Sequence, residues 1–252
     1  MPGEGCCGGF FNQGQEEYIV FSLAPLGWEY RGFMCGMSIV YREWNNMMAM
    51  GRRDIKVLSR AFACAAKAHA GQVRKGSTVP YIVHPMSVAT TLMKHGASRD
   101  VVIAGLLHDV LEDTPVGRFR LRKMFGRRVA DLVAAVSEPD KLTKVSDAEK
   151  RRNWRERKVH KIASIRSASR DVKRLVCADK MDNLADTMAN VKAKGAKAWT
   201  IFRAPKRSQE WYYRSMCAAL ATEPHGIGRT VLFAELKGLV NGVFGKAHRR
   251  NG

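Results

Sequence analysis

Four potential metal ligands lie in three separate apolar segments of this chain. His84 stands in VPYIVHPMSVATTL, the pair His108 and Asp109 in AGLLHDVLEDT, and Asp179 in RLVCADKMDNLADT. Imidazole and carboxylate groups bind divalent ions, and ligands so far apart in the sequence can meet around one ion if a helical bundle brings their segments together. The set therefore predicts a metal-dependent enzyme.

Two further carboxylates accompany the His-Asp pair. Apolar residues recur at helical spacing from 104 to 111 and a proline follows the segment, so we expect a helix that ends near residue 114. Residues four apart share a helix face, which places His108 beneath Glu112 and Asp109 beneath Asp113. Four ionisable side chains on an apolar helix are costly to bury unless a cation offsets their desolvation. A bound metal is the simplest explanation.

The other two segments are also typical of helices. Next to an apolar stripe, one face carries Asp179, Asn183 and Asp186 or Thr187, three or four residues apart. Asp179 can bind an ion, and Asn183 can hold substrate or water. His84 precedes a proline, which is favoured in the first turn of a helix, so this ligand is expected at a helix start, where it is held firmly.

These segments resemble the HD-domain hydrolases of the RelA/SpoT type, which remove the 3′-pyrophosphate from the alarmone ppGpp. Four blocks appear in the family's order and at similar spacings: HAGQVRKGSTVPYIVHP, LLHDVLEDT, FGRRVADLV and ADKMDNLADT. The blocks SEPDK, WRERK and WYYRSMCAAL are similar to stand-alone, hydrolase-only members, so the resemblance covers roughly residues 54 to 221. It implies an all-α fold, a single HD-domain helical bundle around a divalent metal site.

The resemblance also implies a metal and a base. His84, His108, Asp109 and Asp179 would bind a divalent ion, usually Mn²⁺ in this family, and two imidazoles with two carboxylates also suit Fe²⁺ or Zn²⁺. Glu112 and Asp113 would position or deprotonate the attacking water. The chemistry agrees, because a metal lowers the pKa of bound water and a nearby carboxylate can accept the proton.

The nucleotide contacts come from two motifs. Arg74 and Lys75 lie in a glycine-containing loop that leads to His84, and the family uses this loop to contact the base and the phosphates. A guanidinium can stack on a purine and pair with phosphate, whereas lysine acts mainly as a point charge. Asn183 and Thr187 match positions near the family's ribose and phosphate site. The implied partner is a guanosine polyphosphate or a related nucleotide.

The chain departs from the family pattern in four places. The loop 74–80 is one residue longer than in many bifunctional members, and Asp182 replaces the usual aromatic residue or histidine before the motif asparagine. Residues 141–153 look like an insertion, and a long N-terminal extension precedes the first block. The loop and Asp182 bear on substrate identity more than on catalysis.

The composition fits one helical domain. The chain has 252 residues, 46% of them hydrophobic, which is enough to bury one substantial core. Alternating strand patterns are nearly absent. Six cysteines without a metal-binding spacing fit a reducing compartment better than a disulfide scaffold, so we expect a cytoplasmic protein.

Three regions differ in character. Residues 1–50 form an N-terminal extension whose glycines and charges argue against a signal peptide or a membrane span. Two alternatives stay open for it: a disordered arm, or an artefact of an upstream start codon. Residues 51–221 are the expected HD hydrolase domain. Residues 222–252 contain VLFAELKGLVNGVF, typical of an amphipathic helix, followed by a basic tail that could pack or meet a partner.

The net charge of +20 allows more than one function. Such a surface attracts a polyphosphorylated nucleotide, nucleic acid or an acidic partner, or is simply a solvated exterior. We predict hydrolysis of the 3′-pyrophosphate of (p)ppGpp to GDP or GTP and pyrophosphate. The alternatives are an HD phosphohydrolase acting on another nucleotide, and a basic nucleic-acid-binding protein with a vestigial HD site. Nucleic acid is secondary because no known binding motif accompanies the charge. The oligomeric state stays open.

Overall fold

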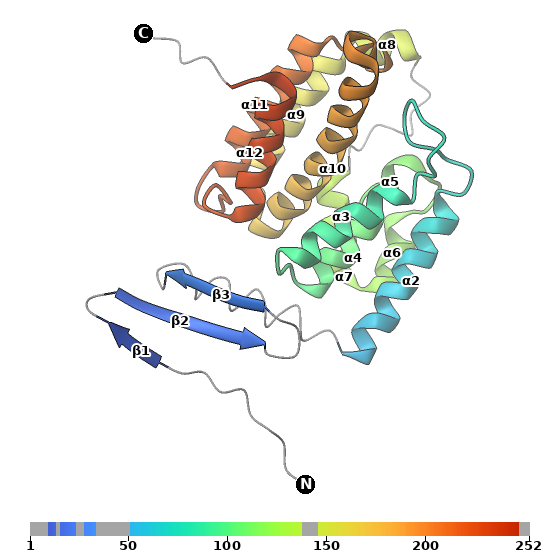
Figure 1. The fold of residues 1–252 in the computed structure, drawn as a ribbon. Helices are drawn as coiled ribbons and strands as arrows, with labels where there is room; N and C mark the ends of the chain where they lie inside the picture. The colour runs from blue at the N-terminus through green and yellow to red at the C-terminus, as the bar shows by residue number, and fades with distance from the viewer. Residues whose placement is uncertain (1–9, 14–15, 24–27, 34–50, 138–145, 247–252) are drawn as a thin grey trace. The chain divides into compact units, whose positions relative to one another are not determined.

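The computed structural model describes residues 10–13, 16–23, 28–33, 51–137 and 146–246 (Figure 1). The chain divides into two compact units, Met1–Ala49 and Met50–Gly252.

The first unit contains a small antiparallel sheet. Its strands lie in the order β1 (Phe10–Gln13), β2 (Glu16–Leu23) and β3 (Trp28–Phe33), and Ile19 pairs with Phe10 on one side and Gly32 on the other. These strands are not among the elements expected from the sequence, because β2 holds the continuous apolar run YIVF in place of a clear alternation. The β-branched and aromatic residues of that run do favour a strand.

The described part of the second unit is helical, apart from an isolated bridge between Val73 and Pro80, which confirms the all-α expectation for this domain. Its elements are α2 (Arg52–Ala68), α3 (Val83–Lys94), α4 (Arg99–Leu107), α5 (Val110–Asp113), α6 (Arg118–Phe125), α7 (Arg127–Val136), α8 (Asp147–Arg152), α9 (Trp154–Arg166), α10 (Arg170–Lys194), the 3₁₀ helix η2 (Gly195–Ile201), α11 (Lys206–Ala221) and α12 (Val231–Phe244).

Local signals set the ends of the longer helices. Ser169 caps α10 by accepting a hydrogen bond from the Val172 backbone N–H, and Thr230 caps α12 in the same way from Phe233. Gly126, with φ 89°, separates α6 from α7, a conformation that strongly favours glycine. Small polar residues and a glycine therefore mark where these helices begin and end.

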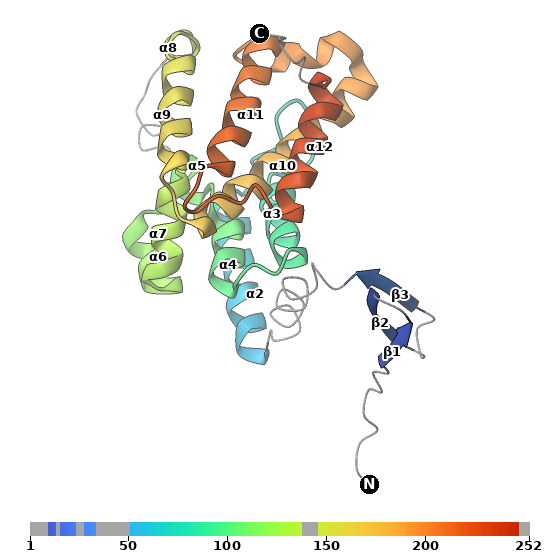
Figure 2. The same cartoon turned by 90° about the vertical axis from the view of Figure 1, so that its left-hand side faces the viewer.

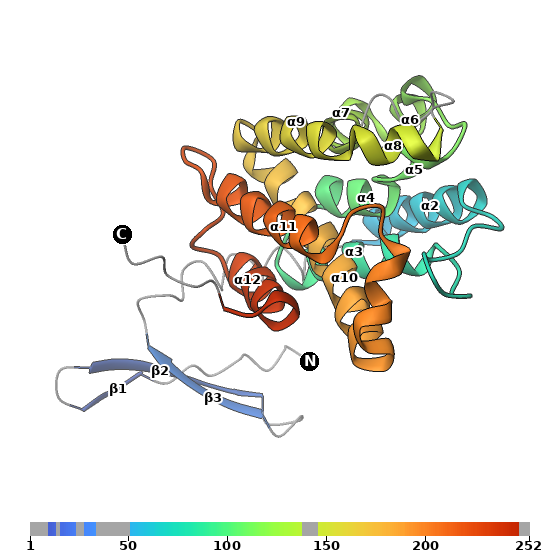
Figure 3. The same cartoon turned by 90° about the horizontal axis from the view of Figure 1, so that it is seen from above.

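The long helix α10 lies at the centre of the domain. It packs against α3, α4 and α7 on one side and against α11 and α12 on the other. Figure 2 shows α9, α11 and α12 gathered together, with α2, α4, α6 and α7 below them. Seen from above, α10 runs beside the α11–α12 pair (Figure 3). Helix α10 thus contacts both the group of α3, α4 and α7 and the pair of α11 and α12.

Close packing joins α3 to α4. Every residue from Val101 to Leu107 is buried, and an added Cβ at Gly105 would come within 2.7 Å of Leu92 Cδ1. Because the two helices approach so closely, the start of α3 and the end of α4 have fixed relative positions. These are the places where His84 and His108 stand.

The helix expected to run to residue 114 is interrupted. Helix α4 ends at Leu107 and the short α5 begins at Val110, so His108 and Asp109 occupy the junction between them. Backbone bonds from Glu112 N and from Asp113 N to the Asp109 carbonyl oxygen resume the helix immediately. The expectation of one uninterrupted helix is corrected, because the two site residues sit between helices and not on a regular face.

The C-terminal segment contains the expected amphipathic helix. Helix α12 buries Leu232, Phe233, Leu236, Val240 and Val243 and packs against α10 and α11. Residues 247–252 of the basic tail lie outside the described residues, as do residues 138–145 at the insertion. Among the described residues, no helix combines the length and the apolar character needed to cross a membrane.

Candidate metal and phosphohydrolase site

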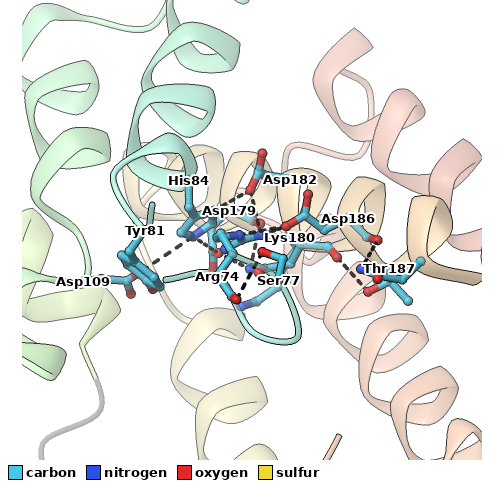
Figure 4. A network of polar contacts seen from close by, with 12 residues as sticks. Arg74, Ser77, Tyr81, His84, Asp109, Asp179, Lys180, Asp182, Asp186 and Thr187 are labelled. Carbon is cyan, nitrogen blue, oxygen red and sulfur yellow. Dashed lines mark hydrogen bonds and ion pairs between the residues drawn. The ribbon is translucent and has the colours of Figure 1, made fainter. Parts of the chain in front are cut away.

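The four predicted ligands come together in one cavity. His84 is the second residue of α3, His108 and Asp109 lie at the α4–α5 junction, and Asp179 projects from α10. All four line a cavity of about 210 Å³. Figure 4 shows His84, Asp109 and Asp179 turned toward one another from three segments. The helical bundle therefore brings the four predicted ligands into one cavity, as expected from the sequence.

The distances between ligand atoms fit a single ion. His84 Nε2 lies 3.5 Å from Asp109 Oδ2 and 3.3 Å from Asp179 Oδ1, and His108 Nε2 lies 3.0 Å and 3.9 Å from the same two oxygens. Atoms held about 2.1 Å from one metal centre are roughly 3.0 to 3.4 Å apart. The ligand atoms of His84, His108 and Asp109 all lie within 4.8 Å of one another, and Asp179 Oδ1 approaches the two imidazoles from α10.

Hydrogen bonds fix which nitrogen of each imidazole faces the cluster. His108 Nδ1 is 2.9 Å from the Gly105 carbonyl oxygen, and His84 Nδ1 is 2.5 Å from Asp182 Oδ2. A carbonyl or an ionised carboxylate can only accept, so both Nδ1 atoms carry a proton and donate it. Each Nε2 is left facing the other ligands. The buried His108 Nε2 has no hydrogen-bond partner among the described residues, which suits a metal ligand.

The carboxylate ligands are held by neighbours of their own. The Tyr81 hydroxyl donates to Asp109 Oδ2 at 2.5 Å. Lys180 Nζ lies 2.6 Å from Asp179 Oδ2, while the Asn183 amide donates to Asp179 Oδ1 at 2.5 Å. Such partners orient metal ligands and tune their affinity.

The cluster stabilises charges of both signs. Burial disfavours a charged imidazole, yet the carboxylates of Asp109 and Asp179 outweigh burial and raise the pKa of His108 to about 9. Burial likewise lowers the pKa of His84, but contacts with Asp179 and Asp182 raise it overall. Burial opposes ionisation of Asp109, whose pKa is nevertheless lowered by His108 and His84. A cation bound at the Nε2 atoms would take the place of the imidazolium protons.

The two predicted base residues differ in position. Glu112 is buried, with 8% of its surface exposed, and lines the cavity, whereas Asp113 is exposed and is not among the lining residues. A carboxylate oxygen of each lies within 4.8 Å of the other and of an Asp109 oxygen. The geometry therefore favours Glu112 as the group nearest to a water inside the cavity.

The predicted nucleotide-binding residues are distributed around the cavity. Asn183 lines it. Arg74 lies beside it, paired with Asp182 and Asp186, and Lys75 stacks over the Phe202 ring with its Nζ 5.2 Å from the ring centroid. Thr187 is buried, donates its hydroxyl to the Asn183 carbonyl oxygen and does not line the cavity. The structure thus brings Asn183 to the ligands and keeps Thr187 away.

Several lining residues were not predicted. They share a cationic or phenolic end group and are Tyr81, Lys158, Lys161, Lys180 and Tyr212. Tyr81 and Lys180 lie inside the motif blocks, next to predicted ligands, and that proximity was the available signal. Lys158 and Tyr212 lie in the blocks WRERK and WYYRSMCAAL, and Lys161 lies three residues after the first of them, but these blocks contain no predicted ligand that would have drawn attention to the three side chains.

Comparison with known proteins agrees with the geometry. The HD domain family matches residues 61–203. The bifunctional (p)ppGpp synthase/hydrolase SpoT of Escherichia coli K12 is 45% identical over 89 residues, which are 35% of this chain and 12% of that protein. The guanosine-3′,5′-bis(diphosphate) 3′-pyrophosphohydrolase of Aquifex aeolicus VF5 is 41% identical over 85 residues, 34% of this chain and 12% of that protein. The matched segments span only about an eighth of the length of these relatives.

Two solved structures match most of their own length. The lmo0812 protein of Listeria monocytogenes EGD-e is 34% identical with a TM-score of 0.56, over 65% of this chain and 99% of that one. A metazoan orthologue of SpoT, described as hydrolysing ppGpp and acting in starvation responses, is 26% identical with a TM-score of 0.56, over 73% and 93% of the two chains. Because the HD domain family matches residues 61–203, more than half of the sequence, this chain belongs to that family.

Proposed function

We propose that the protein is a metal-dependent phosphohydrolase that converts ppGpp to GDP, or pppGpp to GTP, with release of pyrophosphate. The observation that carries the proposal is the convergence of His84, His108, Asp109 and Asp179 in a cavity that Glu112 also lines. The names of the relatives support the substrate, since three of them are described as hydrolysing ppGpp.

The residues around the cavity suit attack by water on a phosphate. His84, His108, Asp109 and Asp179 would hold a divalent ion, which would lower the pKa of water and act as a Lewis acid toward a phosphoryl oxygen. Glu112 is placed to accept the proton of the attacking water, whose oxygen forms a bond to the 3′-linked phosphorus. The bond from phosphorus to the ribose 3′ oxygen breaks, that oxygen takes up the proton held by Glu112 to become the 3′ hydroxyl of GDP, and pyrophosphate is released. Lys158, Lys161 and Lys180 line the cavity and offset the negative charge of the phosphates.

Mn²⁺ is the ion that we propose for this site. Two imidazole nitrogens and two carboxylate oxygens suit Mn²⁺, and also Fe²⁺ or Zn²⁺, better than an ion that prefers thiolates. The proposal also places the reaction in the cytoplasm. The chain has six cysteines, and Cys64, Cys177 and Cys217 are free thiols, which suits a reducing compartment.

A substrate panel tests the proposal. The full chain is incubated with Mn²⁺ and ppGpp, pppGpp, or other nucleotides, and the products are separated by anion-exchange chromatography. GDP and pyrophosphate from ppGpp, absent with chelator and with Asp109→Ala, are expected. Turnover of a different nucleotide alone would reject the alarmone while retaining the HD chemistry. Salt-sensitive RNA binding without metal-dependent turnover would favour the nucleic-acid alternative.

A further inference from the structure

One carboxylate oxygen contacts both a metal ligand and the nucleotide-binding loop. Asp182 Oδ2 lies 2.5 Å from His84 Nδ1 and 3.1 Å from Arg74 Nη2 (Figure 4). The side chains involved are largely shielded from water, with 2% of His84, 12% of Arg74 and 16% of Asp182 exposed. Water therefore screens these two interactions weakly.

A second carboxylate contacts Arg74 and no metal ligand. Asp186 Oδ2 accepts from Arg74 Nε at 2.7 Å and also from Nη2, but its side chain is 51% exposed. Asp182 and Asp186 lie four residues apart on α10, so they share a face of the helix. Asp186 is thus a matched control, because it contacts Arg74 as Asp182 does but does not share the contact of Asp182 with His84.

Arg74 itself is held in place by its loop. Its backbone N–H donates to the Val79 carbonyl oxygen at 2.8 Å, and Lys194 Nζ lies 3.4 Å from the Gly76 carbonyl oxygen near the end of α10. Gly76 has φ 74°, and an added Cβ there would lie 3.3 Å from Ile201 of η2. The loop is therefore fixed to α10 and η2 at several points, and at one of these points Asp182 also contacts the metal ligand His84.

We propose that Asp182 is a positioning residue that couples the nucleotide-binding loop to the metal site, an inference that rests on the proposed function. Its carboxylate keeps the proton on His84 Nδ1, which directs Nε2 to the ion and increases the basicity of that ligand. Its same oxygen holds the Arg74 guanidinium beside the cavity. Because both donors draw on one anionic oxygen, a change in either contact alters the other.

Metal titration of the nucleotide-free protein separates this role from hydrolysis. Mn²⁺ binding to the full chain is measured by calorimetry for Asp182→Asn, Asp182→Leu and Asp186→Asn. The loss of a charged partner behind a metal-ligating histidine costs about 10- to 100-fold in affinity. We expect Asp182→Asn to weaken Mn²⁺ binding about tenfold and Asp182→Leu to weaken it more, whereas Asp186→Asn changes it less than about twofold. Circular dichroism checks that each variant is folded.

A double-mutant cycle tests the coupling itself. Arg74→Gln removes the guanidinium that competes for Asp182 Oδ2, so it should tighten Mn²⁺ binding in the natural chain and have a smaller effect beside Asp182→Asn. Equal effects of Arg74→Gln in both backgrounds would overturn the coupling. Equal Mn²⁺ affinities of Asp182→Asn and Asp186→Asn would overturn the positioning role. Neither result depends on which nucleotide is hydrolysed, so failure of this inference is distinguishable from failure of the proposed function.

Discussion

Lys180 Nζ lies 2.6 Å from Asp179 Oδ2, while the other oxygen of the same carboxylate, Oδ1, is the one that lies 3.3 Å from His84 Nε2. The two residues are neighbours on α10 and are equally shielded, each with 16% of its side chain exposed. Burial favours the neutral acid, but Lys180 and the imidazoles hold the pKa of Asp179 well below its usual range. A fixed cation therefore keeps this ligand ionised before any metal binds.

Replacement of Lys180 tests that relationship. Lys180→Met keeps most of the length and removes the charge, so it should destabilise the metal-free protein by about 3 kcal/mol, the lower end of the cost of breaking a buried ion pair, since Asn183 still contacts the carboxylate. Mn²⁺ should offset part of the loss. Urea unfolding with and without Mn²⁺ measures both effects, and Lys180→Arg is the control that retains the charge. Equal stability of Lys180→Met and the natural chain would contradict the pairing.

Removal of the metal should lower thermal stability. An ion that binds only the folded chain contributes about 2.7 kcal/mol at a concentration one hundred times its dissociation constant. We therefore expect chelation to lower Tm, and Mn²⁺ to restore it. Asp109→Ala should lose this response, because Asp109 Oδ2 lies 3.0 Å from His108 Nε2 and 3.5 Å from His84 Nε2. A normal Mn²⁺ response in Asp109→Ala would show that the ion binds elsewhere.

Glu112 and Asp113 should differ in their contribution to turnover. Glu112→Gln keeps the size of the buried side chain and removes its basic oxygen, so kcat should fall about 10²-fold or more with Mn²⁺ binding retained. Asp113→Asn, at an exposed position outside the cavity, should lower kcat less than about tenfold. Steady-state kinetics on ppGpp, with Mn²⁺ affinity measured separately, compares them. The reverse order would make Asp113 the base.

Arg74 should affect binding more than chemistry. Its guanidinium lies beside the cavity and is held there by Asp182 and Asp186. If it contacts the nucleotide equally in the ground and transition states, Arg74→Ala raises KM and changes kcat little. Kinetics at saturating Mn²⁺ measure both constants. A fall in kcat with an unchanged KM would instead place Arg74 in the chemical step.

A chain that starts at Met50 should fold and remain active. The structure separates Met1–Ala49 from Met50–Gly252, and α2 begins at Arg52, so the cut removes no helix of the second unit. We expect the same helical circular dichroism signal per domain and unchanged kcat/KM. Insoluble or unfolded protein after this truncation would show that the first unit stabilises the second.

The convergence of the four candidate ligands in one cavity was predictable because each lies in a short motif with its own helical or turn signal. The proline after His84 predicted a helix start for that residue, and His84 is indeed the second residue of α3. The break at His108 was not predictable from hydrophobic spacing, since apolar residues continue on both sides of it. The spacing of apolar residues indicates a regular helix, but it does not show that His108 and Asp109 lie between two helices.

Contacts across helices were harder to infer than the ligands themselves. Asp182 was visible only as a departure from the family pattern, and its role depends on His84 and Arg74, about a hundred residues away. Thr187 has a type and spacing suited to a site, but its hydroxyl bonds to the carbonyl oxygen one turn back along α10. The helix face predicted from the sequence therefore includes residues, such as Thr187, that do not line the cavity.

Helix α10 carries the ligand Asp179 on one turn, and Asp182 and Asp186, which hold Arg74, on the turns that follow. A substitution at Asp186 removes a contact of Arg74 and leaves the Asp182–His84 contact in place, whereas a substitution at Asp182 changes both. Lineages that share this fold can therefore inherit the reaction intact and diverge in substrate one side chain at a time.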